Sequence, residues 1–202
     1  MPFDAIRAQH IGMFRHLEIE QLHQWRMDKP YWRDVGTLKA YWQAHMELLD
    51  PLSEMTLYNP LWPIRTVSFA DPPSYSYPSG GHDCMVNRVL AAEGSRILGA
   101  TVSRSVLSRN CVIQSGSVVE ESIIGQSVVI GRNCRIKRAI IDSYNFIADN
   151  TVIGEDPEED AKNYFVDPHS GLVTMGMPRI LYQKDGDDDD KATNSFSWSS
   201  FS

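Results

Sequence analysis

The stretch Ile124-Gly125-Gln126-Ser127-Val128-Val129-Ile130-Gly131-Arg132-Asn133-Cys134-Arg135 decides the fold class of this chain. It repeats one pattern twice, an isoleucine and a glycine followed by four further residues. Aliphatic β-branched residues continue at every sixth position on its two sides, at Val106, Val112, Val118, Ile124, Ile130 and Ile136. A second row with the same period contains Val128, Cys134, Ile140, Phe146 and Val152. A helix repeats every 3.6 residues and a flat strand every two, so a period of six fits neither.

This period indicates short parallel strands that are joined by tight corners and coiled into a solenoid. The pattern resembles the hexapeptide repeat of left-handed parallel β-helices. The sequence therefore predicts a mainly β fold, a single-stranded left-handed β-helix over residues 96–182. We expect about three coils over residues 96–154, with the six aliphatics of the first row pointing inward. Asn133, Asn145 and Asn150, with Gly125 and Gly131, are expected near corners, where positive φ is needed.

The flanking regions have other patterns. Residues 1–50 are predicted to be helical, in one segment over 1–29 and a second over 38–49 that ends at Asp50-Pro51. Residues 51–95 are rich in proline and glycine and predict an extended linker with one or two strands. The acidic run Glu155–Asp160 favours the start of a short C-terminal helix, because carboxylates stabilise a helix N-terminus. Residues 183–202 form an acidic and serine-rich tail that is predicted to be disordered.

Composition excludes several classes of function. The chain of 202 residues has a net charge of -7 and lacks a basic stripe, so we expect no nucleic-acid partner. It lacks the roughly 20 successive apolar residues of a membrane span, and its start does not have the pattern of a signal peptide. Cys84, Cys111 and Cys134 form no C-x-x-C pair and are expected to be small buried side chains. These features predict a cytoplasmic protein that is not bound to a membrane.

Three blocks resemble one known family. They are Tyr31-Trp32-Arg33-Asp34-Val35-Gly36-Thr37-Leu38, then Leu61-Trp62-Pro63-Ile64-Arg65-Thr66 with Pro72-Pro73, and Val152-Ile153-Gly154-Glu155 through Glu158-Glu159-Asp160-Ala161. On these blocks, the chain from Pro30 to about Ile180 resembles the C-terminal part of bacterial glucose-1-phosphate adenylyltransferase, also called ADP-glucose pyrophosphorylase. The first block resembles the end of that family's nucleotidyltransferase domain, the second its linker, and the third the end of its β-helix.

The resemblance implies a reaction of glucose 1-phosphate with ATP that gives ADP-glucose and pyrophosphate for glycogen synthesis. In the family, a glycine-rich loop holds the triphosphate and two aspartates hold Mg²⁺. Asp34 matches the second aspartate, and Trp32 matches a residue beside the glucose-phosphate pocket. Residues 1–29 contain no G-G-x-G-x-x-L segment. We therefore expect no catalysis and no cofactor for this chain alone, with Asp34 a Mg²⁺ ligand only if a partner completes the site.

The resemblance also implies a cleft for anionic regulators beside the β-helix. Basic residues near that place are candidate anion ligands, namely Arg132, Arg135, Lys137, Arg138 and Lys162. The alternative is that these side chains are simply solvated. The helix after the Glu-Glu-Asp block is less basic here than in the family, which favours the alternative.

Three functions remain open at this stage. The first is an oligomerising and regulatory C-terminal portion of a glucose-1-phosphate adenylyltransferase, as a homo-oligomer. The second is a structural module that pairs with an intact paralogue. The third is a hexapeptide acyltransferase, which usually needs a catalytic histidine, but no histidine lies between His82 and His169.

Overall fold

The structure is a computed structural model, and it describes residues 31–50, 53, 55, 57–58, 64, 67 and 69–178. The helix predicted within residues 1–29 and the disorder predicted for residues 183–202 lie outside the described residues. Most of the Leu61–Thr66 block also lies outside them.

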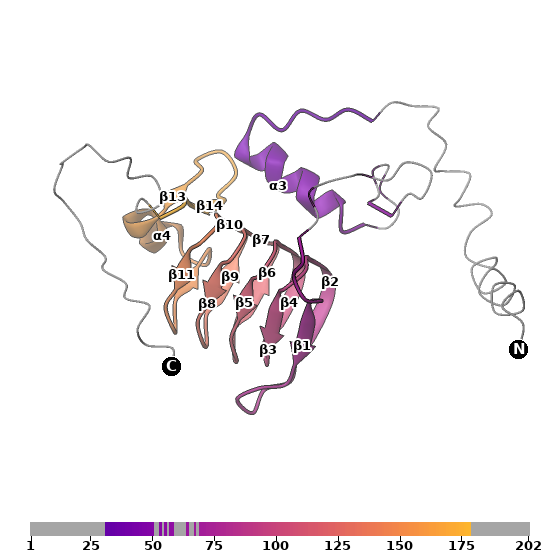
Figure 1. The fold of residues 1–202 in the computed structure, drawn as a ribbon. Helices are drawn as coiled ribbons and strands as arrows, with labels where there is room; N and C mark the ends of the chain where they lie inside the picture. Colours follow the sequence, from indigo (N-terminus) through magenta and orange to yellow (C-terminus); the bar gives the residue numbers. More distant parts are fainter. Residues whose placement is uncertain are drawn as a thin grey trace, which may run out of the picture.

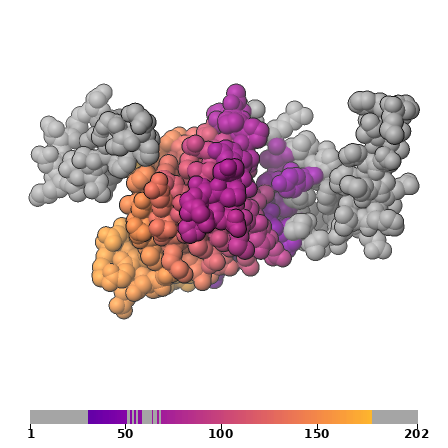
Figure 2. All heavy atoms as spheres, turned by 90° about the horizontal axis from the view of Figure 1, so that it is seen from below, coloured from indigo at the N-terminus to yellow at the C-terminus, as the bar shows by residue number. Residues whose placement is uncertain are grey.

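The described chain forms a parallel β-helix with one α-helix lying along it and a second at its end (Figure 1). The helices are α3 (Leu38–Glu47) and α4 (Pro157–Asn163). The strands are β1 (Tyr75–Tyr77), β2 (Met85–Ala91), β3 (Arg96–Leu98), β4 (Thr101–Leu107), β5 (Val112–Ile113), β6 (Val118–Glu120), β7 (Ile123–Ile124), β8 (Val129–Ile130), β9 (Arg135–Lys137), β10 (Ala139–Ile141), β11 (Phe146–Ile147), β12 (Val152–Ile153), β13 (Phe165–Val166) and β14 (Val173–Met175). Successive coils lie next to one another in chain order, as the colours from magenta to orange show (Figure 2).

The strands make three faces. The first face contains β1, β3, β5, β8 and β11, which pair in parallel in that order. Strand β4 spans the other two faces, because its first half pairs with β6 and its second half with β7. The second face continues through β9 and β12, and the third through β10 and β14. This arrangement is the mainly β solenoid that the sequence predicted.

The solenoid begins before residue 96. Strands β1 and β2 lie inside the range 51–95 that was predicted to be a linker with one or two strands, and they pair in parallel with β3 and β4. Because β1 and β2 are hydrogen-bonded to the next coil, they form the first coil of the solenoid and are not a linker that leads to it. Proline and glycine mark the turns of this coil, which is why composition alone resembled a linker.

The length of one coil is seventeen residues over most of the solenoid. The register places Ile113 beside Ile130 and Ile130 beside Ile147, and it places Leu107, Ile124 and Ile141 in one row in the same way. Two of the three sides therefore advance by six residues and the third by five. The short side is the step from the second face to the third, where one residue with positive φ turns the chain, at Arg104, Glu121 and Arg138.

Because the short side has five residues, the inward-facing positions move by one residue in every coil relative to a strict count of six. The prediction that the whole first row points inward is therefore wrong for Val106, Val112 and Val118, which are only half-buried. Their neighbours Leu107, Ile113 and Val119 fill the core instead, at 2%, 0% and 0% exposure. After the short corner at Glu121, the count of six falls on inward-facing positions, so Ile124, Ile130 and Ile136 are buried as predicted.

The side chains of the second six-residue row change from inward-facing to outward-facing at the next short corner. Val128 and Cys134 are buried, whereas Phe146 and Val152, which follow Arg138, are exposed. Large aliphatics from the three faces therefore meet along the axis. Each contributes roughly 1.5 to 3 kcal/mol of burial free energy, which holds the stacked coils together.

Small polar side chains occupy the second inward position of each side. The Ser122 hydroxyl donates to the Glu120 carbonyl at 2.7 Å and accepts from the Ala139 N–H of the next coil at 3.1 Å. The Ser117 hydroxyl donates to the Gly131 carbonyl and accepts from the Cys134 N–H, both in the next coil. Within the described residues, no buried side-chain nitrogen or oxygen lacks a hydrogen-bond partner. The serines therefore join adjacent coils without leaving an unsatisfied polar group in the core.

The cysteines take the same small positions. Cys111 and Cys134 are buried, Cys84 is half-buried, and all three are free. The Cys111 thiol lies 3.0 Å from the Gly125 carbonyl oxygen, to which it donates. Burial raises the pKa of the Cys111 thiol to about 11, so it stays protonated and can remain a donor. This agrees with the prediction of small buried side chains for Cys111 and Cys134.

Most of the corners are formed by residues in the left-handed region. Asn133 and Asn150 have φ values of 54° and 63°, as expected for their positions. Asn145 instead points inward and donates to the Asp142 and Gly176 carbonyls. Gly125 and Gly131 follow strands β7 and β8 at places where the next coil approaches closely, and neither has a positive φ. These two glycines are needed for space rather than for backbone conformation.

The two helices begin where capping residues allow. The Thr37 hydroxyl accepts from the Ala40 N–H at 3.1 Å, which starts α3 within the predicted range. Asp156 accepts from the N–H groups of Glu158 and Glu159, and Pro157 is the first residue of α4. The predicted helix start in the Glu155–Asp160 run is confirmed. No helix in the described ranges is both long and apolar enough to cross a membrane.

The phase of the core can be tested with two adjacent valines. Val119 is fully buried and Val118 is half-buried on the opposite side of the same strand. We expect Val119→Ala to lower the free energy of unfolding by about 2 kcal/mol, because it removes two methyl groups from the core. We expect Val118→Ala to cost less than about half of that. Urea unfolding of both variants measures the difference, and equal losses would contradict the seventeen-residue register.

A second pair tests close contact between coils. Gly154 and Gly171 both have positive φ, but a Cβ at Gly154 would lie 1.7 Å from the Lys137 carbonyl oxygen, whereas one at Gly171 meets nothing within 4 Å. Gly171→Ala should cost about 1 kcal/mol for its backbone conformation alone. Gly154→Ala should cost clearly more, since β9 must also move. Thermal unfolding compares the two, and a smaller loss for Gly154→Ala than for Gly171→Ala would refute the contact.

Candidate functional site

The Asp34 segment lies directly before α3. The Asp34 carboxylate accepts a hydrogen bond from the Gly36 N–H at 2.9 Å, which forms a local turn ahead of the Thr37 cap. Trp32 is 83% exposed, so it lines no pocket wall among the described residues. Arg33 forms an ion pair with Glu47 at the far end of α3, and Glu47 raises the pKa of Arg33. The segment is therefore folded back along the helix that follows it.

The donor set at Asp34 does not make a magnesium site by itself. Mg²⁺ requires near-octahedral oxygen coordination, which usually combines carboxylates with phosphate oxygens and water. Asp34 is one exposed carboxylate, and one of its oxygens is used by Gly36. In the described stretches of the chain, no three His, Cys, Asp or Glu side chains gather where they could hold a metal. Any magnesium chemistry at Asp34 needs ligands from elsewhere.

The structure separates the candidate anion ligands. Arg132 and Arg138 lie at the two corners that flank β9, and Arg135 lies on that strand. The Arg135 Nε donates to Glu155 at 2.8 Å, and Lys162 pairs with Glu159 at 2.5 Å on the exposed side of α4. An anion at these residues would compete with carboxylates that are already bound to them. They do not form one basic pocket.

Arg138, another candidate anion ligand, contacts both the C-terminal segment and α3. Its guanidinium donates to the Ser170 carbonyl at 3.1 Å, and it lies 5.3 Å from the centre of the Trp42 ring. The Trp42 indole N–H in turn donates to the Glu121 carbonyl at 2.6 Å. A cation over an indole ring and a hydrogen bond to the same indole hold the middle of α3 against the short corners of the β-helix. Arg104 pairs with the Glu121 side chain at 3.5 Å and extends this contact along the corner.

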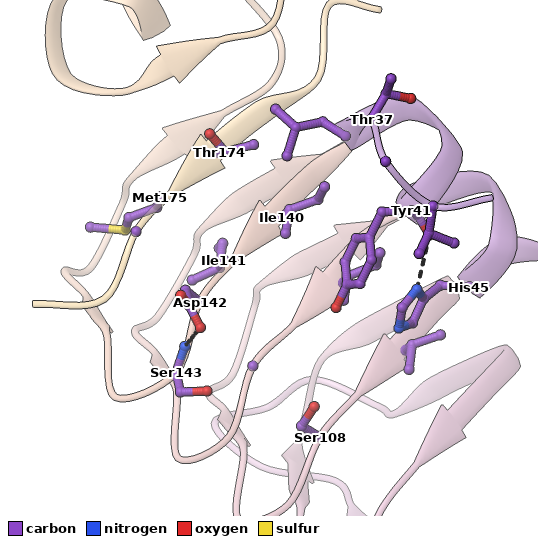
Figure 3. A pocket seen from close by; sticks show the side chains of 17 residues that line it. Thr37, Tyr41, His45, Ser108, Ile140, Ile141, Asp142, Ser143, Thr174 and Met175 are labelled. Atoms are coloured by element: carbon purple, nitrogen blue, oxygen red, sulfur yellow. Dashed lines mark hydrogen bonds between the residues drawn. The ribbon is translucent and has the colours of Figure 1, made fainter.

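A cavity of about 610 Å³ lies between α3 and the third face. Its floor is formed by outward residues of β4, β7, β10 and β14, and its roof by Tyr41 and His45 with the residues at the start of the helix (Figure 3). The Tyr41 and His45 rings are 4.3 Å apart, and His45 Nδ1 lies 2.9 Å from the Tyr41 carbonyl oxygen. Because a carbonyl only accepts, this nitrogen carries the proton and donates.

The cavity holds one carboxylate. Asp142 follows β10, and its Oδ1 accepts from the Ser143 N–H at 2.7 Å (Figure 3). Burial, and then the Asp142 charge, raise the pKa of the Tyr41 phenol. Neither Trp32 nor Asp34 lines this space. The sequence predicted a helix over residues 38–49, which contains Tyr41 and His45, but no cavity beside it. It gave no sign of Asp142, because the neighbours of Asp142 along the cavity come from other coils.

Comparison with known proteins agrees with this fold. Residues 72–175 match the family of the GlmU-like, C-terminal hexapeptide domain, in agreement with the left-handed hexapeptide β-helix that the sequence predicted. This range starts just before β1, so it includes the first coil that composition had suggested was a linker.

Curated relatives match a larger part of the chain. A glucose-1-phosphate adenylyltransferase of Photobacterium profundum is 44% identical over 152 residues, which are 75% of this chain and 38% of that protein. The enzyme of Thiobacillus denitrificans is 44% identical over 160 residues, 78% of this chain and 36% of the relative. The enzyme of Francisella tularensis subsp. novicida is 38% identical over 159 residues, with 77% and 37% covered. The chain thus spans little more than a third of these relatives and is similar to their C-terminal part. With its hexapeptide coils matched over residues 72–175, the chain belongs to the GlmU-like, C-terminal hexapeptide family.

Proposed function

We propose that the β-helix and α3 form the C-terminal assembly and regulatory portion of a protein of the glucose-1-phosphate adenylyltransferase type, which acts in the cytoplasm in glycogen synthesis. The observation that carries this proposal is the similarity to the C-terminal part of those enzymes over about three quarters of the chain, 75% and 78% in two relatives. The docking of α3 by Trp42 supports it, because the Asp34 segment is thereby attached to the solenoid.

In this proposal the residues described here do not catalyse the reaction alone. Transfer of the adenylyl group requires a cradle for the triphosphate and charge neutralisation by Mg²⁺. When bound, the metal would stabilise charge between the two substrates. Asp34 would offer it one oxygen, while the other stays with the Gly36 N–H. Trp32 is exposed beside it and would take part only when another domain or chain covers it.

The proposed regulatory role rests on Arg132, Arg135, Arg138 and Lys162. An anionic regulator at Arg135 or Lys162 would replace the carboxylates of Glu155 or Glu159, which are exposed and weakly held pairs. At Arg138 it would replace the Ser170 carbonyl and the Trp42 ring, and so would act on the attachment of α3. This link between a corner of the β-helix and the Asp34 segment supports a regulatory rather than a purely structural role.

The assembly role has a candidate surface on the first coil. Tyr75, Tyr77, Met85 and Val86 are 52%, 64%, 65% and 47% exposed there. Apolar side chains that gather on one end of a solenoid are typical of an interface. The partner would be a second copy of this chain or an intact paralogue. An acyltransferase is a weaker candidate, since no histidine lies between His82 and His169 to act as a base.

We expect no adenylyltransferase activity from this 202-residue chain alone. Positioning of substrates supplies roughly 7 to 11 kcal/mol of barrier lowering, and it is lost without a nucleotide site. Release of pyrophosphate from ATP and glucose 1-phosphate with Mg²⁺ should therefore equal the background without protein. The Photobacterium profundum enzyme serves as the positive control in the same assay. Turnover by the wild-type chain that Asp34→Ala abolishes would overturn the proposal.

We also expect the chain to form an oligomer. Light scattering at tens of micromolar should give a mass above 22.9 kDa by a whole-number factor. Tyr77→Glu should shift the chain toward monomer, because it places a charge on the exposed first coil. Tyr144→Glu is the matched control, since Tyr144 is 47% exposed at a corner of another coil. A wild-type chain that stays monomeric, or equal effects of both variants, would argue against this surface.

A further inference from the structure

We propose that the cavity between α3 and the third face binds a small organic cation with an apolar body, such as a free alkylammonium ion. This site is separate from the Asp34 segment and from the basic residues around β9, and the inference does not rest on the proposed function. Three observations carry it: the form of the floor, the charge of the lining, and the placement of glycines beside Asp142.

The floor consists of two parallel rows of outward side chains. Coil stacking places Val106, Ile123 and Ile140 in the first row, with Thr174 beside Ile140 on β14. Ile123 is only 5% exposed, so α3 already shields this row from water. A flat row of β-branched side chains offers dispersion contacts to an alkyl chain but no hydrogen bonds.

The second row lies two residues further along each strand, at Ser108, Gly125, Asp142 and Gly176. Asp142 is its one charged member. Among the described residues, the cavity wall includes no lysine and no arginine, and no basic side chain forms an ion pair with Asp142. A carboxylate without a counter-ion at the edge of an apolar surface favours a cation and repels phosphate and carboxylate ligands.

A glycine leaves room on one side of this carboxylate. Gly176, in the coil on that side, has open space around its Cβ position. On the other side, a Cβ at Gly125 would lie 2.5 Å from the Ser143 nitrogen, so the backbone of the next coil already fills that place. The ammonium group of a ligand can therefore approach Asp142 from the direction of Gly176. Its alkyl part would then lie along the adjacent row of Ile140 and Ile123.

The roof completes a site for a cation. The Tyr41 ring faces the floor near Ile140 (Figure 3), and an aromatic face attracts a cation. At the start of α3, the Gly36 and Ala40 N–H groups are used by Asp34 and Thr37, so these two donors are not offered to an anion. The Nδ1–H of His45 donates to the Tyr41 carbonyl, so this donor is not offered to an anion either.

Three small probes test the proposal. Butylammonium, 1-butanol and butyrate each have a short linear alkyl chain, and they differ in their polar head group, which is cationic, neutral or anionic. Titrations of the 202-residue chain at pH 8, followed by amide chemical shifts, should show butylammonium binding about tenfold more tightly than 1-butanol, as one charge-assisted hydrogen bond implies. Butyrate should not bind. The shifts should be largest in α3, β7 and β10.

Asp142→Asn should abolish the preference for butylammonium, because it removes the charge and keeps an oxygen for the Ser143 N–H. Asp149→Asn is the matched control, since Asp149 also accepts a backbone N–H, from Arg132 at 2.7 Å, but does not line the cavity. Its binding should be unchanged. Circular dichroism melts of both variants show that they fold.

Several outcomes would overturn the proposal. They are equal binding of the three probes, tighter binding of butyrate, and an unchanged preference in Asp142→Asn. Binding of glucose or glucose 1-phosphate at this place with higher affinity than butylammonium would assign the cavity to sugars instead. Tighter binding of an N-acetyl-lysine amide than of butylammonium would assign it to a lysine side chain of a protein, and would exclude the free amine.

Discussion

The turn at Arg104, Glu121 and Arg138 is the constraint on which the rest of the structure depends. Each of these residues turns the chain from the second face to the third with one residue in the left-handed region. A side chain with a Cβ pays roughly 1 to 2 kcal/mol for that conformation. The backbone hydrogen bonds from the Glu121 N–H to Ser103 and from the Arg138 N–H to Glu120 offset this cost by tying each corner to the coil before it. The result is a coil of seventeen residues in which the short side always lies at the same place.

The shape of the core follows from that coil. Large aliphatics stack on aliphatics and serines or cysteines stack on small residues, because each position returns after seventeen residues. A serine at a small position can then accept from an N–H of the next coil, as Ser117 and Ser122 do. Its hydroxyl donates to a carbonyl of its own coil at Ser122 and to one of the next coil at Ser117. These hydroxyls take the place of water molecules, which could not enter so narrow an interior.

Sequence reasoning predicted the class of the fold well and its phase less well. The repeats Ile124-Gly125 and Ile130-Gly131 are separated by one full face step of six residues, so a count of six places both isoleucines in the core. The count fails across Glu121 and Arg138, because arginine and glutamate carry no signal for a left-handed corner, whereas Asn133 and Asn150 do. The Asp34 segment was found from its resemblance to a family. The role of Trp42 was not predicted beyond its place in a helix over residues 38–49, because its partners Glu121 and Arg138 are distant in the sequence.

The same short corner explains why α3 covers the third face. By shifting the phase, it turns Val106, Ile123 and Ile140 outward in register and so creates an apolar row on the third face. On the second face, the corresponding outward row contains both Val118 and Arg135, so it can remain in contact with water. The corner carbonyl of Glu121 and the guanidinium of Arg138 lie beside the apolar row, where Trp42 reaches both. A helix that docks there by one indole covers the row without filling it, because no residue of α3 is fully buried. The cavity beside Asp142 is therefore a consequence of the coil length and the shallow seating of α3 together.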